Sequence, residues 1–390
     1  MNLENAKGTL HAFYEEVQNQ AARKQDYIAN TSALEVQTLP HGPHGTNVTV
    51  MTLPSDAGVP TTEFTINDVA FDQMSAKNGI DVRTARRLQA DYPQEFDAVS
   101  NAIHKKESKD VTLRTFDGNG TGGGKILRAM VSAKFKTYDH PDLLGAVLPP
   151  LMASDANWEI VNASITERRM YARFRSREIT GSGANIGDPM AHGLGISNSE
   201  TGHGSVSVAM IVWALICLNG MQTERKTRSA HLTSSRSDAD TWSILADDTK
   251  AADNQALTLK LRDVAADYAK RESFDAACEK MRAAANDTID GGIAAAQSAV
   301  EALGGVLKLS KVETSSVLDG LMTTLQQDGY RGQPLSRATL VNAVTAVGNA
   351  TATNADDVDD WQRRGGKVLD LPANQWSSIA TAYQPEMVAA

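Results

Sequence analysis

The stretch that most constrains the fold is residues 192–221, HGLGISNSETGHGSVSVAMIVWALICLNGM. A short apolar run is interrupted by NSETGHG, and Asn, Ser and Gly favour a turn there because their backbones tolerate turn conformations. After Ser205 apolar and polar residues alternate, and the chain then becomes continuously apolar, as in a strand covered on both faces. Asn219-Gly220 forms a second turn. The stretch therefore predicts a strand, a polar turn, a long core strand and a turn.

A second property of this stretch is the pattern NSE-x-G-x-GS, followed by C-x-NGM and then by a His in a basic segment. The residues that carry it are Asn198, Ser199, Glu200, Gly202, Gly204, Ser205, Cys217, Asn219, Gly220, Met221 and His231. The pattern resembles a phage and plasmid protein family known as domain of unknown function 932. Other segments fit the same family in the same order, among them Leu113-Arg114-Thr115 and Tyr138-Asp139-His140. The resemblance implies a phage, prophage or plasmid protein, and it implies no particular activity.

The centre of the chain predicts further strands. Residues 111–116 and 126–135 flank a glycine-rich loop as a hairpin, and residues 158–166 and 170–179 form a second hairpin joined by Glu167-Arg168-Arg169. Asp139 is a candidate N-cap for a helix between the two hairpins. Together with the opening stretch, this order predicts an α+β fold with a mostly antiparallel β-sheet core, flanking helices and a helical C-terminal part.

Changes in pattern divide the chain into four segments. Residues 1–60 read as an N-terminal helix followed by an extended arm, and residues 61–110 as a small helical segment. Residues 111–236 form the β-rich core. Residues 237–390 form a helical C-terminal region, in which apolar residues recur at helical spacing.

Composition bears on the compartment. The longest apolar run, residues 209–218, is roughly half the length that a bilayer requires, and the N-terminus lacks the layout of a signal peptide. Cys217 and Cys278 lie far apart in apolar patterns, which favours buried thiols over a disulfide. We therefore expect a cytoplasmic protein of a bacterial host cell that has no contact with a membrane.

The charges are unevenly distributed. The net charge is −9, yet residues 111–236 carry 14 Lys and Arg against 10 Asp and Glu. Arg173, Arg175 and Arg177 recur with period two, so they share one face of their strand with Tyr171. A row of guanidinium groups suits a phosphate backbone, and a tyrosine suits base stacking. The same pattern also fits a solvated sheet face paired with acids. The predicted nucleic-acid-binding residues are Lys125, Arg128, Lys134, Lys136, Arg168, Arg169, Tyr171, Arg173, Arg175, Arg177, Arg225, Lys226 and Arg228.

The sequence predicts no catalytic residue, metal site or cofactor. It has neither C-x-x-C nor H-E-x-x-H spacing, and Ser199 lacks the context of a nucleophile elbow. Glu200 remains the most interesting acid. It either pairs with an arginine of the neighbouring hairpin, such as Arg169 or Arg173, or caps amides of its own turn.

The function predicted from these features is single-stranded DNA binding or annealing in homologous recombination. A strand-rich centre with a basic face, followed by helices, resembles the RecT, Red-beta and Erf class of annealing proteins in architecture alone. That resemblance implies a homo-oligomer. One alternative is a non-catalytic assembly or virion-associated protein. The other is a metal-dependent enzyme acting on nucleic acid, which would require acids gathered around Glu200.

Overall fold

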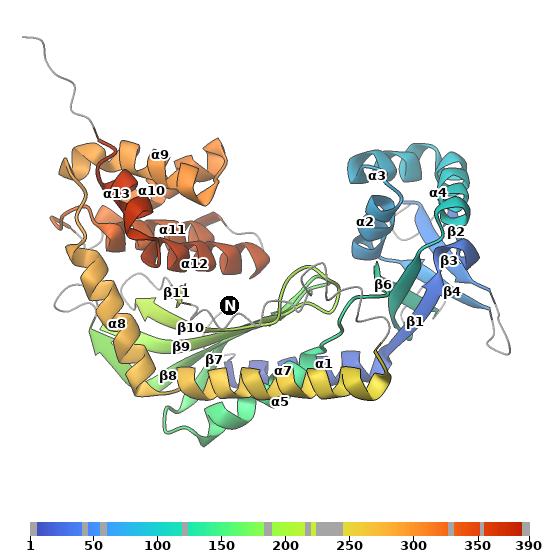
Figure 1. Ribbon diagram of the computed structural model, residues 1–390, viewed down its shortest axis with the longest axis horizontal. Coiled ribbons are helices and arrows are strands. Elements are labelled where there is room, and N and C mark those ends of the chain that lie inside the picture. Colours follow the sequence, from blue (N-terminus) through green and yellow to red (C-terminus); the bar gives the residue numbers. More distant parts are fainter. Residues whose placement is uncertain are drawn as a thin grey trace, which may run out of the picture.

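The protein contains two β-sheets, each with its own covering helices (Figure 1). The computed structural model describes residues 6–40, 46–54, 61–118, 124–182, 189–214, 220–223, 245–326, 331–351 and 355–383. The N-terminal sheet lies at the right of Figure 1, and the second sheet lies at the centre between two groups of helices. This arrangement confirms the predicted α+β class, with mostly antiparallel strands and a helical C-terminal part.

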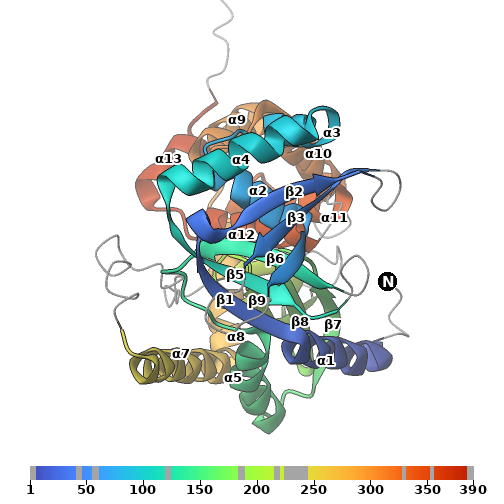
Figure 2. The same ribbon diagram turned by 90° about the vertical axis from the view of Figure 1, so that its right-hand side faces the viewer.

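The N-terminal sheet has six strands in the order β1-β5-β6-β4-β3-β2. All neighbouring strands are antiparallel except β4 and β6. The strands are β1 (Lys24–Asn30), β2 (Glu35–Leu39), β3 (Val48–Leu53), β4 (Thr62–Ile66), β5 (Asp110–Phe116) and β6 (Lys125–Ser132). One side of the sheet is covered by α2 (Asp68–Lys77), α3 (Val82–Asp91) and α4 (Pro93–Glu107), as Figure 2 shows. A separate hydrophobic core, which includes Phe64, Phe71 and Phe96, holds these layers together.

Strand β2 is an edge strand, and helix α4 protects part of it. Asn101 binds both backbone groups of Val36, at 2.8 Å from its N–H and 2.9 Å to its C=O. Asp97 accepts hydrogen bonds from the N–H and the hydroxyl of Thr38, each at 2.7 Å. These bonds satisfy backbone groups that would otherwise offer a template for another strand.

The second sheet has five antiparallel strands in the order β11-β10-β9-β8-β7. They are β7 (Trp158–Ile165), β8 (Met170–Ser182), β9 (Pro189–Asn198), β10 (Ser207–Ala214) and β11 (Gly220–Thr223). The strand–turn–strand predicted around the NSETGHG motif is confirmed as β9, a turn and β10. Gly220 begins β11 and pairs with Trp213.

Helices cover both faces of the second sheet (Figure 1). Below it in the figure lie α1 (Ala6–Arg23), α5 (His140–Ala153) and α7 (Asp247–Tyr268), and α8 (Arg271–Asn286) follows α7 along one end. Above it lie α11 (Arg337–Thr351) and α12 (Ala355–Leu369), with α9 (Ala296–Leu307), α10 (Lys311–Gln326) and α13 (Ala373–Ala380) beyond them. Two short 3-10 helices, η2 (Thr31–Ala33) and η5 (Gly292–Ala295), complete the described elements. None of the described helices is both long and apolar enough to cross a membrane.

The strands are distributed between the two sheets differently from the division into segments that the sequence predicted. Strands β5 and β6 belong to the N-terminal sheet, not to the sheet of β7 to β11. The predicted extended arm supplies β2 and β3, but β1 is formed by residues predicted to belong to the N-terminal helix, which ends at Arg23. Strand β4 likewise lies in the segment 61–110 that was predicted to be helical. Helix α1 packs in the core of the second sheet. The physical reason is long-range pairing: Lys24 lies opposite Phe116, and no local pattern encodes a pairing of such separation.

A close helix contact generates a stability prediction. Gly365 is buried in α12, and an added Cβ would overlap the methyl group of Thr345 in α11. Gly365→Ala should therefore destabilise the fold by ~1–3 kcal/mol in urea unfolding. Gly145→Ala is the matched control, because Gly145 is an exposed glycine of α5 with nothing within 4 Å of the new Cβ. This variant should gain ~0.5–1 kcal/mol. Shifts of the same sign in both variants would contradict the close packing of α11 on α12.

Candidate functional site

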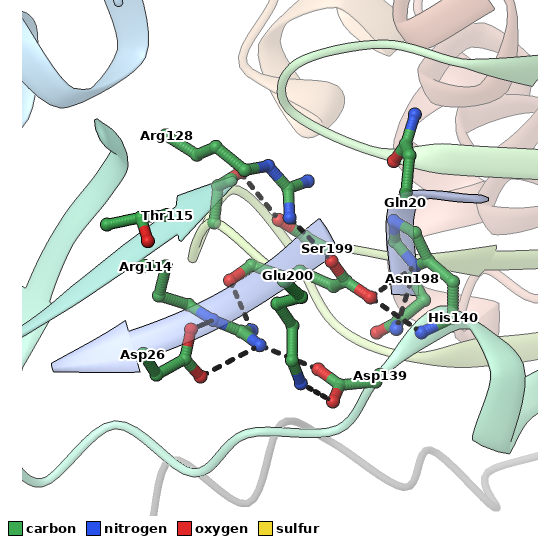
Figure 3. A network of polar contacts seen from close by, with 12 residues as sticks. Gln20, Asp26, Arg114, Thr115, Arg128, Asp139, His140, Asn198, Ser199 and Glu200 are labelled. Atoms are coloured by element: carbon green, nitrogen blue, oxygen red, sulfur yellow. Dashed lines mark hydrogen bonds and ion pairs between the residues drawn. The ribbon is translucent and has the colours of Figure 1, made fainter. Parts of the chain in front are cut away.

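The turn between β9 and β10 lies where the two sheets meet, and its Glu200 ties them together (Figure 3). Glu200 accepts a hydrogen bond of 2.8 Å from Arg128 Nη1 of β6 through Oε2. Its other oxygen accepts a hydrogen bond of 2.8 Å from the backbone N–H of His140 at the start of α5. Only 5% of the Glu200 side chain is exposed. One buried carboxylate therefore joins the N-terminal sheet, the second sheet and α5.

A second arginine of the N-terminal sheet completes the connection. Arg114 of β5 is fully buried and donates through Nη1 to the backbone oxygen of Glu200, at 2.7 Å. Its Nη2 lies 2.7 Å from Asp139 and 3.3 Å from Asp26. Lys24 forms an ion pair with Asp139. We call Lys24, Asp26, Arg114, Arg128, Asp139 and Glu200 the charged joint.

The charged joint balances three cations against three carboxylates, and burial sets its electrostatics. Burial alone would raise the pKa of Glu200, but His140 and Arg128 hold it below its usual value. The pKa of Arg128 is lowered by burial, against the effect of Glu200. Burial also opposes the charge of Arg114, but Asp139 and Asp26 outweigh it and raise the pKa of Arg114. Removing any single partner would leave a buried charge uncompensated.

The neighbouring residues of the motif fix the turn to the second sheet. Asn198 donates to the backbone oxygen of Tyr138 at 2.8 Å and lies 3.1 Å from His140 Nδ1. Ser199 and Thr201 donate from their hydroxyls to the backbone oxygen of Arg168, at 2.7 and 3.0 Å. These bonds attach the turn to the tip of the β7–β8 hairpin.

Gly202 and Gly204 of the motif are each required for a different geometric reason. Gly202 has φ +81°, and α2 reaches this part of the turn because Gln73 donates to the backbone oxygen of Thr201, at 2.7 Å. Gly204 has φ +154°, and an added Cβ would overlap the guanidinium of Arg169, which donates to the backbone oxygen of His203. Glycine is therefore required both for backbone conformation and for close approach of an arginine.

Glu200 does pair with an arginine, but the predicted partner was wrong. Its arginine is Arg128, not Arg169 or Arg173, because β6 belongs to the other sheet and reaches the turn across the junction. The hydrogen bond from the His140 amide resembles the predicted capping role, but the amide belongs to α5. Both carboxylate oxygens are engaged, so this geometry suits a structural tie better than proton transfer to a substrate.

Arg173, Arg175 and Arg177 of β8 were predicted to form a row that faces solvent, and the structure shows that they do not all do so. Arg173 is 5% exposed and Tyr171 is 3% exposed, so neither is available to an extended ligand at the surface. Helix α12 covers this part of the face: Asp359 Oδ1 lies 3.7 Å from Arg173 Nη2, and Arg363 donates to Ser197 and Ser207. Arg175 and Arg177, farther along β8, both pair with Glu159 of β7. The alternative expectation, a face paired with acids, describes these residues better.

Three more of the predicted binding residues are paired. Lys125 pairs with Asp117, Lys136 pairs with Asp253, and Arg128 belongs to the charged joint. Three other predicted cations are at least partly accessible to solvent: Arg168 and Lys134 are exposed, and Arg169 is half-buried and donates to the backbone oxygen of His203. Ser205 is exposed after the turn. Several predicted positions lie outside the described residues, namely Cys217, Asn219, Arg225, Lys226, Arg228 and His231.

Sequence reasoning missed most of the charged joint. Lys24 and Asp26 were not predicted to have any role, and Arg114 and Asp139 were noted only in segments that fit the family, Asp139 also as a candidate helix cap. One usable signal was Arg114, a charged residue within the otherwise uncharged run 111–116 of β5. A buried arginine must be paired with carboxylates. Arg114 in this strand therefore indicated that acidic residues from elsewhere in the chain lie beside it.

Comparison with known proteins finds no matching family model, no matching curated protein and no matching solved structure. The resemblance to the phage and plasmid family therefore stays a prediction. Among the described residues, no group of three or more His, Cys, Asp or Glu side chains is arranged to hold a metal ion.

The buried His140, whose backbone N–H binds Glu200 of the charged joint, predicts a pH dependence. Burial lowers the pKa of His140 to about 4 from 6.5, so the unfolded chain binds a proton that the folded chain refuses between these values. Stability should thus fall as the pH drops from 6.5 towards 4. His140→Gln should flatten this part of the profile by up to about 3 kcal/mol in urea unfolding.

The control for this experiment is His11→Gln, since His11 lies on the exposed side of α1. Its pH profile should follow that of the wild type. A His140→Gln profile as steep as the wild-type profile would show that His140 is not held neutral by its surroundings.

Proposed function

We propose that the protein binds single-stranded DNA, and that it does so at the tip of the β7–β8 hairpin beside the charged joint. The observation that carries the proposal is the accessible cationic group Arg168, Arg169 and Lys134, which we call the basic tip. This group replaces the sheet face inferred from the sequence, because α12 and Glu159 occupy that face.

Hydrogen bonds from the β9–β10 turn fix the backbone of the basic tip. The hydroxyls of Ser199 and Thr201 bind the backbone of Arg168, and the guanidinium of Arg169 lies against Gly204 and donates to Tyr171 Oη at 3.3 Å. Lys134 follows β6, whose residue Val131 would lie 3.4 Å from a Cβ on Gly202. Both cationic segments therefore flank the same turn. A rigid backbone beneath exposed cations lowers the entropic cost of binding a polyanion.

The chemistry of the basic tip favours the backbone over the bases. Guanidinium and ammonium groups recognise phosphate oxygens, which positions a strand without reading its sequence. The aromatic residue predicted to stack on bases, Tyr171, is buried, so we expect weak sequence preference.

The biological setting follows from the resemblance stated for the sequence. The family resemblance implies a phage, prophage or plasmid protein, and the architectural resemblance to the RecT, Red-beta and Erf class implies annealing in recombination by a homo-oligomer. The enzymatic alternative requires Glu200 to serve a metal or a substrate, yet both its oxygens already accept charge-assisted or backbone hydrogen bonds. Binding without catalysis is therefore the function that we propose.

A salt series tests the basic tip. In fluorescence anisotropy with a labelled oligonucleotide, the wild type should bind more weakly as salt rises, because each neutralised phosphate releases a counterion. The double variant Lys134→Gln/Arg168→Gln should flatten the log–log salt slope by up to ~1.4, or ~0.7 per lost contact. Its melting temperature should change little, because exposed charges contribute little to folding.

The control is Lys105→Gln/Lys106→Gln, which removes the same charge from an exposed end of α4. Its slope should equal the wild-type slope. Absence of wild-type binding at low salt would overturn the proposal, and equal flattening by both double variants would reduce the interaction to net charge.

A further inference from the structure

The two edge strands of the N-terminal sheet differ in how their outer sides are covered (Figure 2). Helix α4 covers part of β2 through the side chains of Asn101 and Asp97, which bind backbone groups of that strand. Strand β1 lies at the opposite edge and pairs with β5 alone. Its outer side is therefore the place where the sheet can be extended by another strand.

Hydrogen bonds at the two ends of β1 show which backbone groups point outward. The N–H of Asp117 donates to the C=O of Arg23 at 2.7 Å, and the N–H of Thr31 donates to the C=O of Lys109 at 2.9 Å. The register between these bonds has no shift, so the odd-numbered residues of β1 bond to β5. The even-numbered residues direct their N–H and C=O groups away from β5.

The outward backbone groups at the centre of β1 belong to Asp26 and Ile28. No residue in the described part of the chain forms a hydrogen bond with these groups. Both residues are exposed, and 78% of Ile28 is accessible to solvent. Edge strands are commonly guarded against pairing by a proline, a bulge or a free lysine. β1 has neither proline nor bulge, and Lys24 is held by Asp139.

A second copy of β1 is complementary to this edge. Two outward-facing edges pair antiparallel about a twofold axis, with outward residues opposite outward residues. With the axis at Ile28, the two isoleucines lie opposite each other and Asp26 lies opposite Asn30. With the axis at Asp26, two carboxylates lie opposite each other, and with the axis at Tyr27, each carboxylate lies opposite an isoleucine. Only the register centred on Ile28 pairs apolar with apolar and a carboxylate with a neutral amide.

We propose that β1 is a dimerisation edge, at which two copies of the chain pair antiparallel about Ile28. The pairing joins two six-stranded sheets into one continuous sheet and gives the backbone groups of Asp26 and Ile28 hydrogen-bond partners. It also covers the exposed isoleucine of each copy. The inference goes beyond DNA binding: the architectural resemblance implies a homo-oligomer but no surface, and this surface is argued from β1 alone.

The length and charge of the contact set its strength. β1 is followed by η2 and preceded by α1, so the paired segment is short and the dimer is weak, with a Kd of roughly 10–100 µM. Each copy carries a net charge of −9, so the copies repel each other and added salt strengthens the dimer. Salt weakens binding to DNA, so its effect on the dimer has the opposite sign.

Sedimentation velocity of the full chain without DNA, from ~5 to ~500 µM, tests the proposal. The wild type should pass from monomer to dimer over this range. Ile28→Lys should remain a monomer, because the register places the two ammonium groups opposite each other. Its melting temperature should change little, since Ile28 is exposed. The matched control is Ile293→Lys, which adds the same charge at an isoleucine of η5 that is 69% exposed, and which should dimerise as the wild type does.

A charge pair tests the register itself. Ile28→Lys and Ile28→Glu should each be monomeric, whereas an equimolar mixture should form a dimer, because an ammonium group then lies opposite a carboxylate. A wild type that stays a monomer overturns the proposal and leaves the edge to a strand of another protein. An Ile28→Lys variant that dimerises as the wild type does, or a mixture that stays monomeric, overturns pairing about Ile28. None of these measurements contains DNA, and the salt slope of the basic tip is measured separately, so either proposal can fail alone.

Discussion

The ion pair between Arg128 and Glu200 is the interaction on which the arrangement of the two sheets depends. Arg128 belongs to β6 of the N-terminal sheet, and Glu200 belongs to the turn that joins β9 and β10 of the second sheet. Both side chains are 5% exposed, so neither ion can exchange its partner for water. Two charges removed from water are tolerated only where their partners satisfy them. Glu200 of the charged joint is satisfied by Arg128 and the backbone N–H of His140, and the guanidinium of Arg128 also lies over the ring of Phe116.

Several features of the fold follow from this joint. The chain passes through it repeatedly, in β1, β5, β6, the start of α5 and the β9–β10 turn. Each passage contributes a charged or backbone group, so the joint brings together segments that lie far apart in the sequence. The same turn also holds the β7–β8 tip through Ser199 and Thr201. The placement of Arg168 and Arg169 at the surface is therefore a consequence of the buried network.

The local patterns of the sequence predicted β7 to β10 and the turn at NSETGHG, because alternation and turn residues are short-range signals. They did not predict which face of β8 meets solvent. Period two separates Tyr171 and Arg173 from Ala172 and Phe174, but both faces are covered, and the cover over Arg173 is α12, encoded far downstream. The partner of Glu200 was missed for the same reason. A charge inside a strand indicates that a partner exists, whereas only the fold determines that the partner of Glu200 is Arg128.

The coupling between Arg128 and Glu200 is the quantity that tests the joint most directly. It is measured by a double-mutant cycle of Arg128→Met and Glu200→Leu in urea unfolding. Each single change should cost about 3–5 kcal/mol, because it strands a buried charge. The double variant should lose at least ~2 kcal/mol less than the sum of the two, because it strands neither. Losses that add to within ~0.5 kcal/mol would show that the two side chains do not depend on each other, and would contradict the joint as the tie between the sheets.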